Sequence, residues 1–82
     1  MVYTRAMRNT PEPNPKTQQY IGRKIREARE RKNLIQQEMA DAVGISVTYY
    51  AGIERGEENP SITIIEIICK VLKIKATDIL PF

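Results

Sequence analysis

The sequence contains no histidine and only one cysteine, Cys69. A single cysteine cannot form an internal disulfide, and it cannot complete a zinc site where histidine is missing. The sequence also lacks a glycine-rich phosphate loop and a nucleophile with a paired base, so we expect neither an enzyme nor a metal or other cofactor. The lone cysteine is typical of a reducing compartment, most simply the cytoplasm.

Long apolar runs are missing as well. No segment reaches the length of a membrane span, and no apolar stretch follows the early arginines as it would in a signal peptide. The 82 residues are enough for one small domain, whose modest core often depends on oligomerisation. We therefore expect a single small domain that does not enter a membrane.

The positive charge of the chain is concentrated in one segment. The net charge is only +3, but residues 16–32 contain seven Lys and Arg residues against Glu27 and Glu30. Such a basic face can lie beside a polyanion. It can equally be the solvated side of a helix, crossed by pairs such as Arg23–Glu27 and Arg26–Glu30, and charge alone favours this second interpretation.

Helical spacing runs through most of the chain. Residues 1–16 have no periodicity and contain three prolines, which predicts a flexible N-terminal arm. Ile21, Ile25 and Ala28 recur at i, i+4 and i+7 and predict an amphipathic helix from about 17 to 32, with Thr17 as its N-cap. Further helices are expected at about 36–43, 47–54 and 62–72, followed by a last short turn from residue 76 or 77. We therefore predict one all-α domain over residues 17–82, a five-helix bundle.

Residues 36–55 have the pattern of a helix-turn-helix unit, in which two short helices are joined by a turn that contains glycine. Ala40 is small enough for the two helices to approach closely, and Gly44 makes the turn. Ile45 and Ile53 are apolar where the second helix must pack back against the rest of the domain. The other side of this second helix, residues 47–54, then projects from the domain and suits the width of the DNA major groove.

Several short motifs share this segment and its flanks: Ile21-Gly22, Ile25-Arg26, Arg29, Leu34, Gln36, Glu38, Ala40, Gly44-Ile45-Ser46, Ile53-Glu54-Arg55-Gly56 and Pro60-Ser61. With these motifs residues 21–80 resemble the Cro/C1-type (XRE) helix-turn-helix family. The resemblance implies a lambda-repressor-like fold and a small, usually dimeric transcriptional regulator that binds a palindromic operator in double-stranded DNA. The run YYAGIERG is most similar to the controller proteins of restriction–modification systems.

The resemblance assigns the recognition helix to residues 47–54. Its base-facing positions are then Val47, Thr48, Ala51 and Gly52. Only Thr48 can hydrogen-bond a base edge, while Val47 and Ala51 can contact a thymine methyl group. Gly52 would let the helix backbone approach the DNA closely. We therefore expect much of the sequence discrimination to come from DNA shape and deformability.

Three further side chains are candidates for contacts with DNA phosphates. The resemblance implies this role for Gln36 and Arg55, although Gln36 could instead cap its helix and Arg55 could be plain solvated surface. Tyr49 is expected to face outward and reach a phosphate or a sugar edge, whereas Tyr50 should pack inward with its hydroxyl at the rim of the core. Arg29 and Glu54 match a pair that in the family forms a partly buried, structural ion pair.

The expected fourth helix has two apolar stripes. One faces the core and consists of Ile62, Ile65, Ile68, Cys69 and Leu72. The other contains Ile64, Ile67 and Val71, and in so small a chain a helix that is apolar nearly all round needs a partner to cover it. We therefore expect a homodimer through Ile64, Ile67, Val71, Ile79 and Phe82, although the second stripe could instead close a thicker monomeric core.

Two departures from the family pattern keep a second function open. Ile35 stands where a polar N-cap is usual, and Glu57-Glu58 place carboxylates where many members carry a basic residue, which would repel DNA. The alternative is a protein-interaction module on the same fold, antitoxin-like or regulator-binding. For the favoured DNA-binding regulator we expect a cytoplasmic, nucleoid-associated protein, with no small-molecule ligand and no membrane partner.

Overall fold

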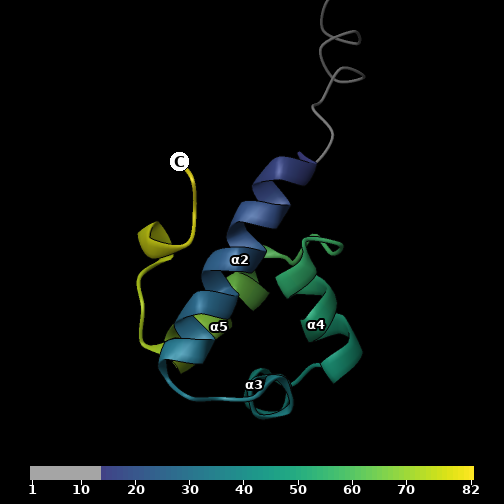
Figure 1. The fold of residues 1–82 in the computed structure, drawn as a ribbon, viewed down its shortest axis with the longest axis vertical. Helices are drawn as coiled ribbons and strands as arrows, with labels where there is room; N and C mark the ends of the chain where they lie inside the picture. The colour runs from purple at the N-terminus through teal and green to yellow at the C-terminus, as the bar shows by residue number, and fades with distance from the viewer. Residues whose placement is uncertain (1–13) are drawn as a thin grey trace, which may run out of the picture.

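Four α-helices and one 3₁₀ turn make up residues 14–82, the part of the chain that the computed structural model describes (Figure 1). In chain order they are α2 (Pro15–Arg31), α3 (Gln36–Val43), α4 (Val47–Arg55), α5 (Ile62–Leu72) and η1 (Ala76–Asp78). The all-α class is confirmed, whereas the count of five helices is wrong, because η1 spans only three residues and closes with an i→i+3 bond from Ile79 N to Ala76 O. Residues 1–13 of the predicted flexible arm lie outside the described part of the chain.

Helix α2 begins earlier than predicted. Its N-cap is Asn14, whose Oδ1 accepts a hydrogen bond from the Lys16 backbone N–H at 2.9 Å, so the prediction of Thr17 as the cap is wrong. Pro15 suits the first helical position, where a backbone N–H would have no helical partner. The apolar face of α2 is as predicted, with Ile21, Ile25 and Ala28 buried.

The bounds of α3, α4 and α5 agree with the predicted ones to within one residue. Ser46 Oγ and Ser61 Oγ cap the starts of α4 and α5, and Gly44 ends α3 in the left-handed conformation at φ 87°. Ile35 offers no side-chain cap to α3, as expected. Glu38 compensates in part, because its Oε1 accepts the otherwise unused Ile35 N–H at 2.8 Å.

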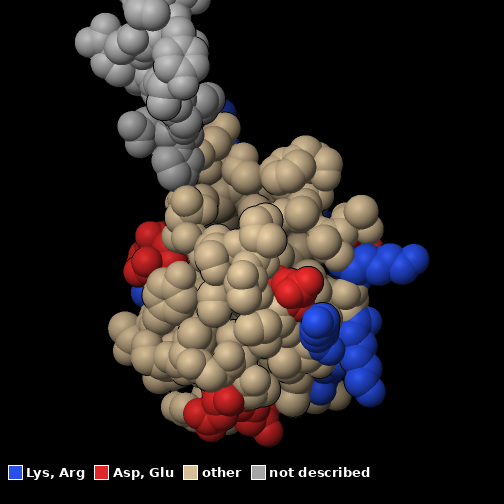
Figure 2. All heavy atoms as spheres, turned by 180° about the vertical axis from the view of Figure 1, so that it is seen from behind, with Lys and Arg blue, Asp and Glu red and all other residues tan. Residues whose placement is uncertain are grey.

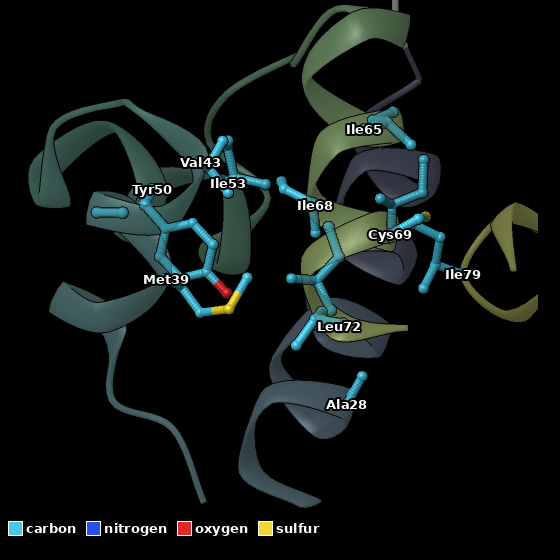
Figure 3. Close-up of a cluster of buried hydrophobic side chains, with 13 residues drawn as sticks. Ala28, Met39, Val43, Tyr50, Ile53, Ile65, Ile68, Cys69, Leu72 and Ile79 are labelled. Carbon is cyan, nitrogen blue, oxygen red and sulfur yellow. The ribbon is translucent and has the colours of Figure 1, made fainter. Parts of the chain in front are cut away.

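The core lies where these helices meet, with α2 and α3 each packed against both α4 and α5 (Figure 3). Two predictions, one for α5 and one for the segment that follows it, are wrong. Ile62 was expected in the core but is 76% exposed, because it lies in the first turn of α5 where no other element covers it. Ile79 was expected in a dimer interface but is 1% exposed, because the segment after α5 folds back and carries it into the core beside Cys69. The largest fully buried side chains are those of Tyr50, Ile25, Met39, Ile53, Ile68, Leu72 and Ile79.

Tyr50 is buried completely, so the expectation that its hydroxyl lies at the rim of the core is wrong. Among residues 14–82 this hydroxyl has no hydrogen-bond partner. Burial raises the pKa of Tyr50 above its usual range, and the nearby Glu54 carboxylate adds to the effect, so the phenol stays protonated.

Replacing Tyr50 by Phe should therefore be harmless to stability. The desolvation cost of a buried hydroxyl without a hydrogen-bond partner offsets its attraction to the nearby Glu54 carboxylate, so Tyr50→Phe is expected to change the free energy of unfolding by no more than about 1 kcal/mol. Urea denaturation followed by circular dichroism measures this. A loss of more than about 1 kcal/mol would show that the hydroxyl interacts favourably in the folded state.

Candidate nucleic-acid interface

Helix α4 presents a narrow exposed face. Its inward side is formed by Tyr50, Ile53 and Glu54, all of which are buried. On the outward side of α4 only Thr48 and Arg55 are exposed, and they are separated by two helical turns. Val47, Tyr49 and Ala51 are half-buried, and parts of Val47 and Tyr49 pack against the core. Of the predicted base-facing residues, Thr48 is thus the one that stands free of the domain.

Gly52 does not present an open backbone. It is buried, and an ideal Cβ built on it would lie 2.8 Å from Glu58 Cγ. In this structure the Glu58 side chain covers the bare helix at Gly52, so the base-facing role of Gly52 stays a prediction that requires Glu58 to move. Glu58 was missed as a site residue. The available signal was a glycine in the middle of a helix, which is typical of a place where another group packs against the helix backbone.

A polar hollow of about 210 Å³ lies where α2, α3 and α4 meet, and it is lined by Arg26, Arg29, Gln36, Glu54 and Arg55. The Arg29–Glu54 pair forms its floor: Arg29 Nε donates to Glu54 Oε2 at 2.7 Å and Arg29 Nη2 donates to Glu54 Oε1 at 3.0 Å. The third guanidinium nitrogen, Nη1, donates to the Leu34 carbonyl at 2.7 Å. This fork joins α2, the loop before α3, and α4.

Gln36 belongs to the same network. Its Nε2 donates to Glu54 Oε1 at 3.0 Å, so the side chain does not cap α3 and does not point freely into solvent. Burial acts to raise the pKa of Glu54, but the hydrogen bonds from Arg29 and Gln36, together with the nearby Tyr50 hydroxyl, outweigh it and the pKa is lowered. Glu54 is therefore a carboxylate that organises the hollow, and within residues 14–82 Gln36 Nε2 makes no second hydrogen bond.

Arg55 stands at the mouth of the hollow and is held by the loop that follows α4. Its Nη2 donates to Glu57 Oε1 at 2.9 Å, and this bond is the main reason why the pKa of Arg55 is raised.

Of the two ion pairs predicted on α2, one is present. Arg26 is paired with Glu30 at 3.1 Å, as predicted. The predicted Arg23–Glu27 pair is wrong: Glu27 lies 3.8 Å from Lys24 Nζ, while Arg23 lies over the Tyr20 ring, 5.4 Å from its centroid.

A family model described as "Helix-turn-helix" matches residues 25–79, the greater part of the chain. The chain belongs to the Cro/C1-type helix-turn-helix family. Membership is supported by three individual proteins. The HTH-type transcriptional regulator YazB of Bacillus subtilis, itself uncharacterised, is 43% identical over 60 residues, which are 73% of this chain and 87% of YazB.

Two solved structures of restriction–modification controller proteins share the fold. C.AhdI from Aeromonas hydrophila matches with a TM-score of 0.72 and 31% identity, covering 76% of this chain and 94% of C.AhdI. C.Esp1396I, solved bound to a 25 base pair operator site, matches with a TM-score of 0.68 and 27% identity, covering 80% of this chain and 84% of C.Esp1396I. The similarity to controller proteins that the sequence predicted is confirmed.

In this helix-turn-helix domain the surface predicted for dimerisation is only partly free. Ile64, Ile67 and Val71 are half-buried and pack in part against the core, and Phe82 is 87% exposed. Helix α5 lies behind α2 in Figure 1, and the view from behind in Figure 2 shows a surface that is mainly uncharged, with one acidic group near its centre and the other charged groups toward its edges. None of the helices described is long and apolar enough to cross a membrane.

Proposed function

We propose that this protein is a transcriptional regulator that binds a specific sequence of double-stranded DNA, with α4 as the recognition helix in the major groove. The observation that carries the proposal is the exposed face of α4, where Thr48 and Arg55 project beside a polar hollow held together by the Arg29–Glu54 fork. A helix presented in this way can enter a groove about as wide as itself. The operator complex of the similar C.Esp1396I supports the proposal.

The side chains divide into two roles. Thr48 contacts a base edge, and Val47 and Ala51 supply apolar surface for a thymine methyl group. Tyr49, Arg55 and the free amide hydrogen of Gln36 contact phosphates, which set the register of the helix on the duplex. Because so few groups can read bases directly, sequence-dependent DNA shape carries much of the specificity.

The regulator acts as a homodimer on a palindromic operator, with recognition helices about 34 Å apart. The interface consists of Ile64, Ile67, Val71 and Phe82, the part of the predicted set that is not consumed by the monomer core. Phe82, 87% exposed, has the most apolar surface still to cover. Sedimentation at high micromolar concentration should give the mass of a dimer, and a monomer under those conditions contradicts this part of the proposal.

Selection of bound sequences from a random duplex pool tests the function directly. The salt concentration should be stated, about 100 mM, since phosphate contacts make the affinity salt-dependent. Wild type is expected to enrich a palindrome, and a Thr48→Ala, Arg55→Gln variant is not. The matched control is Thr77→Ala, Lys73→Gln, which removes one hydroxyl and one positive charge at exposed positions away from α4. A well-folded wild type that enriches nothing refutes the proposal.

The Arg55–Glu57 pair leads to a more specific prediction. Arg55 must leave Glu57 to reach a phosphate, and Glu57 itself repels the phosphate. Glu57→Gln is therefore expected to tighten DNA binding, by roughly two- to fivefold at low salt, as suits an exposed pair. Fluorescence anisotropy with a labelled duplex measures the affinity. In an Arg55→Gln background the same substitution should give a smaller gain, and an equal gain would show that the two side chains act independently.

One observation favours the alternative of a protein-interaction module. Both exposed arginines at the hollow, Arg26 and Arg55, already have carboxylate partners, and an acidic loop follows α4. A surface of this kind can receive a protein partner with its own charge pairs. If the selection yields no enriched sequence, this alternative becomes the favoured function.

A further inference from the structure

We propose that Glu58 is a base-reading residue that replaces the side chain missing at Gly52, and that its carboxylate selects a cytosine in each half of the operator. The inference rests on the proposed function, since it requires α4 to lie in the major groove. It concerns a residue outside the recognition helix, in the loop that returns over the end of α4.

The position of Glu58 relative to α4 carries the inference. An ideal Cβ at Gly52 would find three atoms of one residue as its nearest neighbours: Glu58 Cγ at 2.8 Å, Oε2 at 3.5 Å and Cδ at 3.7 Å. The Glu58 side chain thus occupies the space into which a residue at position 52 would project. Thr48 and Gly52 are separated by one helical turn and share a face of α4. Through its packing on Gly52, the Glu58 side chain lies on the face of α4 that also carries Thr48, one helical turn away.

The backbone keeps Glu58 in this place. Glu57 N donates to Gly52 O at 2.9 Å and Gly56 N donates to Ile53 O at 3.1 Å, with Gly56 in the left-handed conformation at φ 77°. This pair of bonds is a Schellman motif, which ends the helix and turns the chain back over its last turn. The loop is thereby tied to α4 itself, so it moves with the recognition helix when the helix docks.

The two carboxylates of the loop have different surroundings. Glu57 accepts a hydrogen bond from Arg55 through Oε1 at 2.9 Å. Glu58, half-buried against α4, makes no hydrogen bond or ion pair within residues 14–82. Its acceptor oxygens are therefore available to a partner that the protein alone does not supply.

The chemistry of a carboxylate selects cytosine among the four bases. An ionised carboxylate can only accept hydrogen bonds. In the major groove cytosine presents the N4 amino donor, whereas guanine presents only acceptors and thymine presents an acceptor and a methyl group. Adenine offers its N6 donor beside the N7 acceptor, which repels a carboxylate but suits an amide. Glu58→Gln is therefore expected to move the preference from cytosine to adenine.

Sequence selection with three variants tests this proposal. Glu58→Gln should lower the preference for cytosine at one position of each half-site by about tenfold, the usual scale for a lost base contact. Glu57→Gln is the matched control, because it removes the same charge from the neighbouring residue. It should tighten binding to all sequences and leave the consensus unchanged. Gly52→Ala should weaken the cytosine preference with the net charge intact, because the new methyl group displaces Glu58 from α4.

The outcomes separate this inference from the proposed function. If wild type enriches an operator and Glu58→Gln only tightens binding uniformly, with the same consensus, Glu58 merely repels phosphates and the inference is wrong while the regulator stands. If wild type enriches no sequence at all, both fail. Thermal unfolding of each variant confirms that the compared proteins are folded.

Discussion

Arg29→Met is expected to lower the free energy of unfolding by about 3–5 kcal/mol, the loss typical of stranding a buried charge. The Glu54 side chain is 2% exposed and that of Arg29 is 11% exposed, so the carboxylate cannot turn to water when the guanidinium is removed. The substitution also leaves the Leu34 carbonyl without its Arg29 donor. The free energy of unfolding of a small domain is only about 5–15 kcal/mol, so a loss of this size leaves the domain close to complete unfolding.

Urea denaturation at neutral pH measures the effect, and Arg26→Met is the matched control. Arg26 also forms an ion pair on α2, with Glu30, but both side chains are more than half exposed. Its removal should cost less than about 1 kcal/mol. Equal effects of the two substitutions would show that the Arg29–Glu54 fork contributes no more than a surface pair.

The pH dependence of this loss follows from the pKa of Glu54. In the folded protein that pKa lies below its ordinary value of 4.5, so the unfolded chain binds the proton more readily. The stability from the fork is therefore complete above about pH 4.5 and is lost as the pH falls through the lower, folded pKa. In Arg29→Met the burial of Glu54 is opposed only by Gln36 and by the nearby Tyr50 hydroxyl, so the pKa of Glu54 is higher than in wild type. The difference between wild type and Arg29→Met should thus shrink at about pH 4, and a constant difference contradicts this account.

Gly22→Ala is expected to destabilise the domain by at least about 2 kcal/mol, although alanine is the better helix former. An ideal Cβ at Gly22 would lie 2.3 Å from the Ile53 carbonyl oxygen and 2.5 Å from that of Glu54. Both are backbone atoms of α4 and cannot rotate away, so α2 and α4 must separate. That separation opens the packing around Ile53 and pulls Arg29 away from Glu54.

Gly52→Ala is the matched control, since it makes the same substitution in a helix. There the added methyl group meets only the side chain of Glu58, which can move. The free energy of unfolding should change little or rise by up to about 1 kcal/mol through helix propensity. Denaturation curves of the two variants test the contrast. If Gly22→Ala is as stable as wild type, the close approach of α2 and α4 is not a requirement of the fold.

The local signals of the sequence predicted most of the secondary structure. Ser46 and Ser61 at helix starts and Gly44 at a helix end act within one turn of chain, so they could be read directly from the sequence. The misplaced start of α2 is a local error of the same kind, because Asn14 was an equally good cap and Pro15 a good first residue. The Glu38 contact to Ile35 N–H was also local and was overlooked.

The candidate site was predicted less well than the helices. The apolar spacing of α5 indicated that it has buried sides, but it did not show that Ile62 stays outside and that Ile79 returns to the core. Gln36 was predicted to contact a DNA phosphate, and its hydrogen bond to Glu54 was not predicted. The two residues are eighteen positions apart, so no local pattern in the sequence indicates this contact. The covering of Gly52 by Glu58 depends on the path of a loop after the helix has ended.

By itself the sequence determined the class of the protein: an all-α helix-turn-helix domain, because periodicity, caps and turn glycines act over a few residues and all point to the same elements. The tertiary structure alone decided which charges are free. It joins Arg55 to Glu57 and places the Glu58 side chain against Gly52, whereas the Arg29–Glu54 pair was already implied by the resemblance to the family. Such pairings depend on how whole helices and loops pack, and each one changes the energy of exposing the groups to DNA.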